Sequence, residues 1–238
     1  MYPNKQTARI AGALYLIVVL TGIFNLMYVP SKLIAGDDAT ATFNNIVAAQ
    51  PLFRFGILSA VVCYIAFLLL PMALYELLKT VDKKYAVLMV VFAMVSVPLS
   101  FANLQHKYAI LDMLEQFNTL SSTDLKNLPA EIMQQLNAYR MGNQVVSIFW
   151  GLWLLPFGIL VYRSGFLPKI LGILLMAGCF GYLINFTGNL LFPYYEKMGV
   201  GSFISLPASL GEIGICLWLL VKGIKNSPAS ASVHPQRT

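Results

Sequence analysis

Six long apolar stretches constrain this chain more than any motif in it. A helix needs about 20 apolar residues to cross a bilayer, and the stretches that meet this length are residues 8–29, 51–79, 84–115, 130–163, 167–191 and 202–225. Only 11% of the 238 residues are charged, whereas soluble domains carry about 25%. A soluble fold has too little interior to hide this much apolar surface. We therefore expect an all-α integral membrane bundle of six transmembrane helices, with the lipid bilayer as its solvent.

The basic residues indicate how the bundle is oriented. Ten of the sixteen Lys and Arg residues fall on one side of the expected topology, at both ends of the chain and in the second and fourth connections. Because cytoplasmic loops of membrane proteins are rich in Lys and Arg, both termini are expected in the cytoplasm. The net charge of +6 is explained in this way, and we expect no nucleic-acid partner.

Residues 1–225 are expected to form one transmembrane domain, and residues 226–238 a disordered cytoplasmic tail without apolar periodicity. Between the first two spans, Asp37 or Asp38 can cap a short helix whose apolar face carries Phe43, Ile46 and Val47. This pattern predicts an interfacial helix that lies on the outer leaflet.

Polar residues recur at helical spacing inside four of the spans. Residues three or four apart share one face of a helix, and the shared faces are Ser96, Ser100, Asn103 and Lys107; Arg140, Asn143, Gln144 and Ser147; Asn185 and Asn189; and Ser205, Ser209 and Glu212. An ionisable group within a span is costly and faces the bundle interior. The four faces therefore predict a polar interior.

The depth of these groups in the membrane follows from the number of residues between each group and the Lys or Arg at the cytoplasmic end of its span. Arg54, Lys107 and Arg140 fall near the outer boundary of the hydrocarbon core, and Glu212 lies deeper, 13 residues from Lys225. The outer half holds four asparagines, Asn25, Asn103, Asn143 and Asn185. We predict an outward-facing polar vestibule with a cationic rim and one carboxylate at its floor.

The predicted ligand-binding residues are the three rim cations, three asparagines and one carboxylate, namely Arg54, Lys107, Arg140, Asn103, Asn143, Asn185 and Glu212. Each has a structural alternative. The cations can extend to lipid headgroups, and Asp112 or Glu115 can pair with Lys107 or Arg140. The asparagines can join helices by hydrogen bonds. Glu212 can form an ion pair, with Arg54 or Arg140 as its candidate partners.

Motifs of common catalytic and cofactor sites are absent from the sequence. It contains no GxxxxGK[ST], HExxH, GxSxG or CxxCH, and its only histidines are His106 and His234. We therefore expect no metal and no cofactor, and Glu212 is the only candidate catalytic residue.

Several stretches resemble a known family. ARIAGALYLIVVLTGIF near the start, LFRFGILS, LYELLK, YRSGFLPKILGILLMAGCFGYLI and GEIGICLWLLVKG together resemble the bacterial membrane-protein family of domain of unknown function 4386 over residues 8–224. The SGFLPKILG turn is the most specific of these pieces. The resemblance implies a six-helix or similar bundle in a bacterial cytoplasmic membrane, and it carries over no activity and no catalytic residue.

Three hypotheses of function remain open. The first, which we rank above the others, is binding or transport of a small amphiphile or anion, with association of two copies giving room for alternating access. The second is an intramembrane enzyme that uses Glu212 as an acid or base, with Asn185, Asn143 or Ser209 as a second group. The third is a structural or partner-binding membrane protein.

Overall fold

The fold is known from a computed structural model that describes residues 4–116 and 122–224. Its described residues form helices and connections without a strand. Six helical segments are long and apolar enough to cross a membrane, and they are Lys5–Leu33, Gln50–Leu78, Lys83–Gln116, Leu125–Arg163, Lys169–Leu191 and Val200–Val221. The prediction of an all-α bundle with six such helices is confirmed. The predicted tail, residues 226–238, lies outside the described residues.

The first span changes its helical geometry in its C-terminal third. It consists of α1 (Lys5–Ile23), a π-helical turn η1 (Phe24–Tyr28) and α2 (Val29–Leu33). In the π-helical turn the N–H of Val29 donates to the carbonyl of Phe24. Such turns insert one residue into a helix and are frequent at functional sites. Asn25 is the buried residue of this turn.

The fourth span is interrupted once. It consists of α6 (Ser122–Leu152) and α7 (Leu154–Arg163), which meet at Trp153. Pro156 lies in the first turn of α7 and has no N–H to donate to the last carbonyl of α6. The break therefore follows from the position of the proline.

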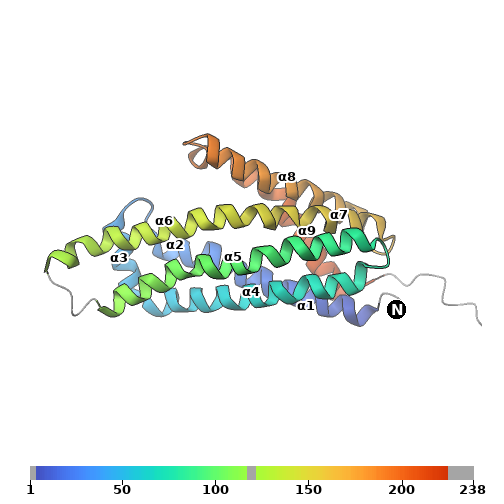
Figure 1. The fold of residues 1–238 in the computed structure, drawn as a ribbon, viewed down its shortest axis with the longest axis horizontal. Helices are drawn as coiled ribbons and strands as arrows, with labels where there is room; N and C mark the ends of the chain where they lie inside the picture. The colour runs from blue at the N-terminus through green and yellow to red at the C-terminus, as the bar shows by residue number, and fades with distance from the viewer. Residues whose placement is uncertain (1–3, 117–121, 225–238) are drawn as a thin grey trace, which may run out of the picture.

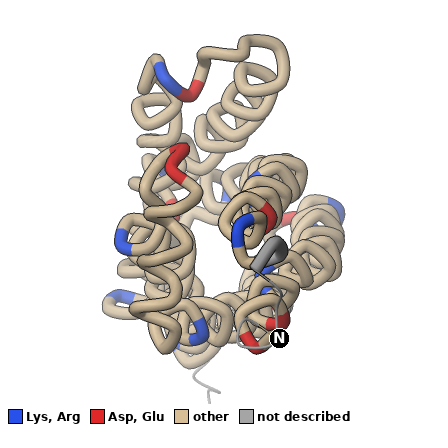
Figure 2. Tube along the Cα trace, turned by 90° about the vertical axis from the view of Figure 1, so that its left-hand side faces the viewer, with Lys and Arg blue, Asp and Glu red and all other residues tan. Residues whose placement is uncertain are grey.

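The other four spans are α4 (Gln50–Leu78), α5 (Lys83–Gln116), α8 (Lys169–Leu191) and α9 (Val200–Val221). Figure 1 shows α1, α4, α5 and α6 running along the long axis, whereas α8 is inclined to them. The N-terminus lies at the end opposite α2 and α3, which we call the loop end. Figure 2 looks onto the loop end and shows that most of each helix carries no charge.

The predicted short helix is α3 (Ala39–Ala48). Of the two predicted caps, Asp38 accepts a hydrogen bond from the N–H of Ala41 at 2.9 Å. Ile46 is fully buried inside the protein, whereas Val47 is exposed. The expectation of an interfacial helix whose face of Phe43, Ile46 and Val47 lies on the outer leaflet is therefore wrong for Ile46, because α3 packs against α6.

Buried side chains form two apolar clusters, one toward the N-terminal end and one toward the loop end. Along α5, the first cluster ends at Val97 and the second begins at Leu104. Ser100 and Asn103 lie between them and are buried. The polar interior thus forms a layer between two apolar cores.

Candidate functional site: an intramembrane cavity and two buried ionisable groups

A cavity of about 270 Å³ lies among α1, η1, α4, α6, α8 and α9. Most of its wall is apolar, and it includes the rings of Trp150 and Trp153. Its polar lining residues include Glu212, Tyr15 and Asn25. A mostly apolar wall with a few polar groups is typical of small-molecule sites.

The cavity reaches the lipid-facing surface of the bundle between α1 and α9. Three of its lining residues are themselves exposed, Ile23 by 45%, Met27 by 66% and Ile213 by 42%. Toward the N-terminal end the same two helices touch, because Gly12 has no side chain: a Cβ there would lie 2.6 Å from the backbone nitrogen of Leu220. The close contact at Gly12 therefore forms the closed end of the cavity.

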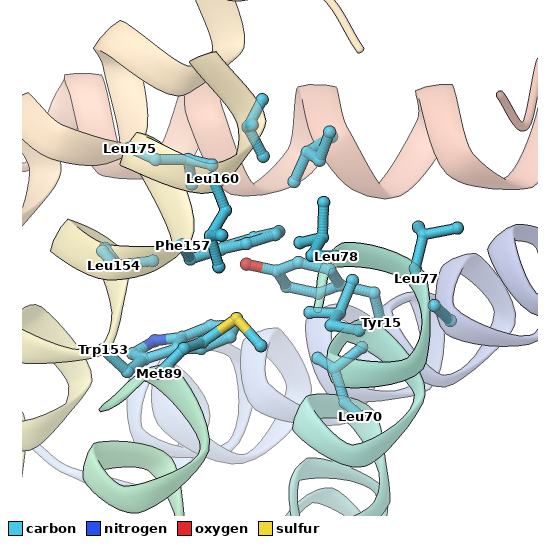
Figure 3. Packing of buried hydrophobic residues seen from close by; sticks show 14 of the residues in the cluster. Tyr15, Leu70, Leu77, Leu78, Met89, Trp153, Leu154, Phe157, Leu160 and Leu175 are labelled. Atoms are coloured by element: carbon cyan, nitrogen blue, oxygen red, sulfur yellow. The ribbon is translucent and has the colours of Figure 1, made fainter. Parts of the chain in front are cut away.

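Glu212 lies at this closed end. The hydroxyl of Tyr15 donates a hydrogen bond to Oε1 of Glu212 at 3.1 Å. The Tyr15 ring is buried beside Trp153 and Phe157, with centroid distances of 6.0 and 6.4 Å (Figure 3). Glu212 is half-buried and lines the cavity. The buried Tyr15 thus fixes the position of the Glu212 carboxylate, which remains accessible from the cavity.

Neither predicted cation reaches Glu212. Arg54 forms an exposed ion pair with Glu115 at 3.0 Å, and Arg140 forms one with Glu196 at 2.7 Å. Within the described ranges no Lys or Arg pairs with Glu212. The alternative of an ion pair with Arg54 or Arg140 is therefore not seen, and the partner of Glu212 among the described residues is the Tyr15 hydroxyl.

Lys107 is directed into the bundle rather than toward lipid headgroups. Its side chain is 5% exposed, and Nζ donates to Oδ1 of Asn25 at 2.7 Å. The same nitrogen lies 4.3 Å from the centroid of the Tyr139 ring, a cation–π distance. In the part of the chain that the structure describes, no carboxylate pairs with Lys107. A charge within a span costs about 2.5–3.5 kcal/mol on insertion scales, so this arrangement is expensive to keep.

Hydrogen bonds connect Lys107 to the cavity wall. Nδ2 of Asn25 is 3.5 Å from the Tyr139 hydroxyl, which is 3.3 Å from the Tyr64 hydroxyl. Asn25 and Tyr64 both line the cavity. Asn103 supports the cluster by donating to the carbonyl of Tyr139 at 2.9 Å. Lys107 therefore lies one side chain behind the wall.

The other predicted asparagines join helices. Asn103 donates to Oδ1 of Asn143 at 3.0 Å and so connects α5 with α6. Asn185 donates to Oγ of Ser205 at 2.8 Å and so connects α8 with α9. These are the helix-joining roles that the sequence left as an alternative.

The predicted site is thus only partly assembled. Of the seven predicted ligand-binding residues, Glu212 lines the cavity, and the other six do not. Whether they bind a ligand stays a prediction. Three residues that the sequence did not single out, Tyr15, Tyr64 and Tyr139, make the hydrogen bonds described above. Tyr15 carried a usable signal, because a buried tyrosine hydroxyl needs a partner and Tyr15 is the only tyrosine in the apolar run 10–27.

Potential metal ligands are not clustered in the part of the chain that the structure describes. Across the described ranges, no three His, Cys, Asp or Glu residues are grouped so that they could hold a metal ion. His106 has Nδ1 at 2.8 Å from Oε1 of Gln135. This histidine is therefore engaged with a neighbouring helix.

Comparison with known proteins identifies the family of this chain. The chain is similar to an uncharacterized protein of Archaeoglobus fulgidus, with 36% identity over 80 residues. These residues are 34% of this chain and 45% of the archaeal protein, so the match spans less than half of that relative. No solved structure matches the chain. The family model of the domain of unknown function DUF4386 matches residues 10–223, and the chain therefore belongs to this family.

Proposed function

We propose that this protein binds a small amphiphile within the membrane, with the polar group of the amphiphile at Glu212 and its apolar part along the cavity. The observation that carries the proposal is the position of Glu212 in the wall of a mostly apolar cavity that opens toward lipid. An amphiphile already dissolved in the bilayer could enter between α1 and α9 without crossing water.

The contacts of Glu212 favour a ligand with a hydrogen-bond donor. A carboxylate can accept several hydrogen bonds, and Tyr15 is the one donor that the described residues give to Glu212. A hydroxyl, an amine or an ammonium group would supply further donors. The earlier idea of an anion at the rim is not supported by Arg54 and Arg140, because both are in ion pairs outside the cavity.

We further propose that the protein lies in a bacterial cytoplasmic membrane with both termini in the cytoplasm. The support is the distribution of Lys and Arg between the two ends of the six spans. In this orientation the loop end faces outward, and the cavity opens into the outer leaflet. Delivery of the ligand across the membrane would need a second conformation, in one chain or in an assembly of two.

The proposal can be tested with 1-decanol as the probe. Two of the three tryptophans, Trp150 and Trp153, line the cavity, so a bound probe changes the intrinsic fluorescence. We expect saturable binding that Glu212→Gln weakens and Gly22→Leu, which fills the cavity, abolishes. Binding that neither substitution alters would contradict the proposal. Native mass spectrometry of the purified protein would then show whether a molecule is retained from the membrane.

One observation favours an intramembrane enzyme as a second candidate. Glu212 and the Ser209 hydroxyl both line the cavity, and Tyr15 orients the carboxylate, as general acid–base chemistry would require. Asn143 and Asn185 do not line it and are bonded elsewhere. If the retained molecule changes mass during incubation in the wild type but not in Glu212→Gln, the enzyme hypothesis replaces simple binding.

A further inference from the structure

A second polar subsite lies at the loop end of the cavity, away from Glu212. Asn25 and Tyr64 form the wall there, and Lys107 lies directly behind Asn25. Along the first span Asn25 is ten residues from Tyr15, or about 15 Å at 1.5 Å per residue. The polar end at Glu212 and Tyr15 is therefore far enough from the polar end at Asn25 for an alkyl chain to lie between them.

The side chains at this second end of the cavity offer hydrogen-bond donors. The Lys107 ammonium has three N–H groups, and Asn25 Oδ1 is the oxygen acceptor that the described residues give it. The Asn25 amide and the Tyr64 hydroxyl add donors in the wall itself. A buried cation is tolerated when an opposite charge compensates it, and none of the described carboxylates is in reach.

We propose that Lys107, Asn25 and Tyr64 form a subsite for an acidic group, a carboxylate, on the amphiphile that the cavity holds. This inference rests on the proposed function, since it takes the cavity as the binding site. The acidic group would accept hydrogen bonds from the Asn25 amide and the Tyr64 hydroxyl and would compensate the charge of Lys107. Rotation of the Asn25 amide would bring the ammonium into direct contact with the ligand.

The π-helical turn contains the residue that connects this subsite with Lys107. Asn25 lies in η1, is 1% exposed and meets both Lys107 and the cavity. The polar contact between the ligand and the buried cation would therefore pass through this turn.

The test compares decanoate, 1-decanol and acetate on the full-length protein in detergent, with tryptophan fluorescence as the readout. Lys107→Met should weaken decanoate binding by about tenfold or more and leave 1-decanol binding unchanged. Arg54→Gln, which removes an exposed cation at the same end, is the matched control and should change neither. Acetate has the acidic group without the tail and should not bind measurably.

The outcomes separate the two proposals. Equal decanoate binding in the wild type and in Lys107→Met would overturn the proposed subsite. Binding of 1-decanol in the same experiment would still support the cavity as a binding site. Acetate binding as strong as that of decanoate also overturns it, because the site would then take a free anion. If 1-decanol fails to bind, the proposed function fails. The unfolding temperature of Lys107→Met, measured in parallel, shows that a lost signal comes from a folded protein.

Discussion

The two ionisable groups buried among the spanning helices are held in different ways. Glu212 is half-buried, has one hydrogen bond from Tyr15 and borders the cavity. Lys107 is almost fully buried, has Asn25 and the Tyr139 ring as its neighbours and lies behind the wall. Glu212 can therefore meet a ligand without any rearrangement, whereas Lys107 can do so only through Asn25.

This difference indicates how each group is stabilised. A carboxylate next to a cavity can be solvated by water or by a ligand. This solvation offsets part of the free-energy cost of placing the charge within the membrane. The Lys107 ammonium is only 5% exposed, so without a ligand it depends on its neighbours Asn25 and Tyr139. We therefore expect substitutions around Lys107 to change stability most, and substitutions around Glu212 to change binding most.

Removal of the oxygen acceptor of Lys107 should have the largest effect on stability. Asn25→Leu leaves Tyr139 as the neighbour of the ammonium, and hydrogen bonds to charged groups contribute about 1.5–3 kcal/mol. We expect the free energy of unfolding in detergent to fall by about that amount. The double variant Asn25→Leu/Lys107→Met should recover much of the loss, because the unsolvated charge is removed. Losses that simply add would show that the two residues are not coupled.

The second largest effect on stability is expected in the closed part of the α1–α9 contact, and substitutions in its open part should cost less. Gly12→Ala places a Cβ against the backbone of Leu220, and overpacking costs about 1–3 kcal/mol. Gly22→Ala is the matched control, because its Cβ would meet only the Cys63 sulfur at 3.9 Å. Thermal unfolding of both variants tests this. Equal destabilisation would contradict the view that the helices separate beyond Gly12.

A smaller loss is expected at the Glu212 end. Tyr15→Phe keeps the buried ring (Figure 3) and removes the hydroxyl that bonds to Glu212. Hydrogen bonds to charged groups contribute about 1.5–3 kcal/mol. Because water or a ligand in the cavity can replace part of this bond, the free energy of unfolding should fall by no more than the lower end of that range. Binding of 1-decanol should weaken as well, since the carboxylate loses its fixed position. Unchanged binding would mean that Tyr15 does not position Glu212.

The smallest effects should come from the two exposed ion pairs. Arg54→Gln and Arg140→Gln each remove one partner, and exposed pairs contribute about 0.2–1 kcal/mol. Neither variant should alter 1-decanol binding. A large loss of binding in either would restore the cationic rim that the sequence suggested.

Much of the fold could be predicted from the sequence because membrane-spanning helices are local features. An apolar run such as 167–191 must form a helix wherever it lies in the bilayer, and Lys169–Leu191 does so. Asp38 likewise caps α3 through its own next residues. Such elements can be predicted without knowing which helices pack against them.

The site could be predicted only in part, because its contacts depend on how the helices pack. Helical spacing placed Glu212 on an inward face, but it could not show that Tyr15, 197 residues away, is its partner. Residue counting placed Lys107 at the membrane boundary, but it could not show that Asn25, in the first span, is its partner. Spacing along one helix also could not show that Glu115 and Glu196 reach Arg54 and Arg140 from other helices.

The most direct test of the account is the reactivity of the native cysteines toward a small, membrane-permeant thiol reagent. Of the three, Cys63 lines the cavity and is half-buried, whereas Cys179 and Cys216 are buried outside it. Mass spectrometry of the folded protein should find rapid modification of Cys63 alone, slowed by Gly22→Leu and by saturating 1-decanol. Modification of Cys63 no faster than of Cys179 and Cys216, or unaffected by both treatments, would contradict an open intramembrane cavity.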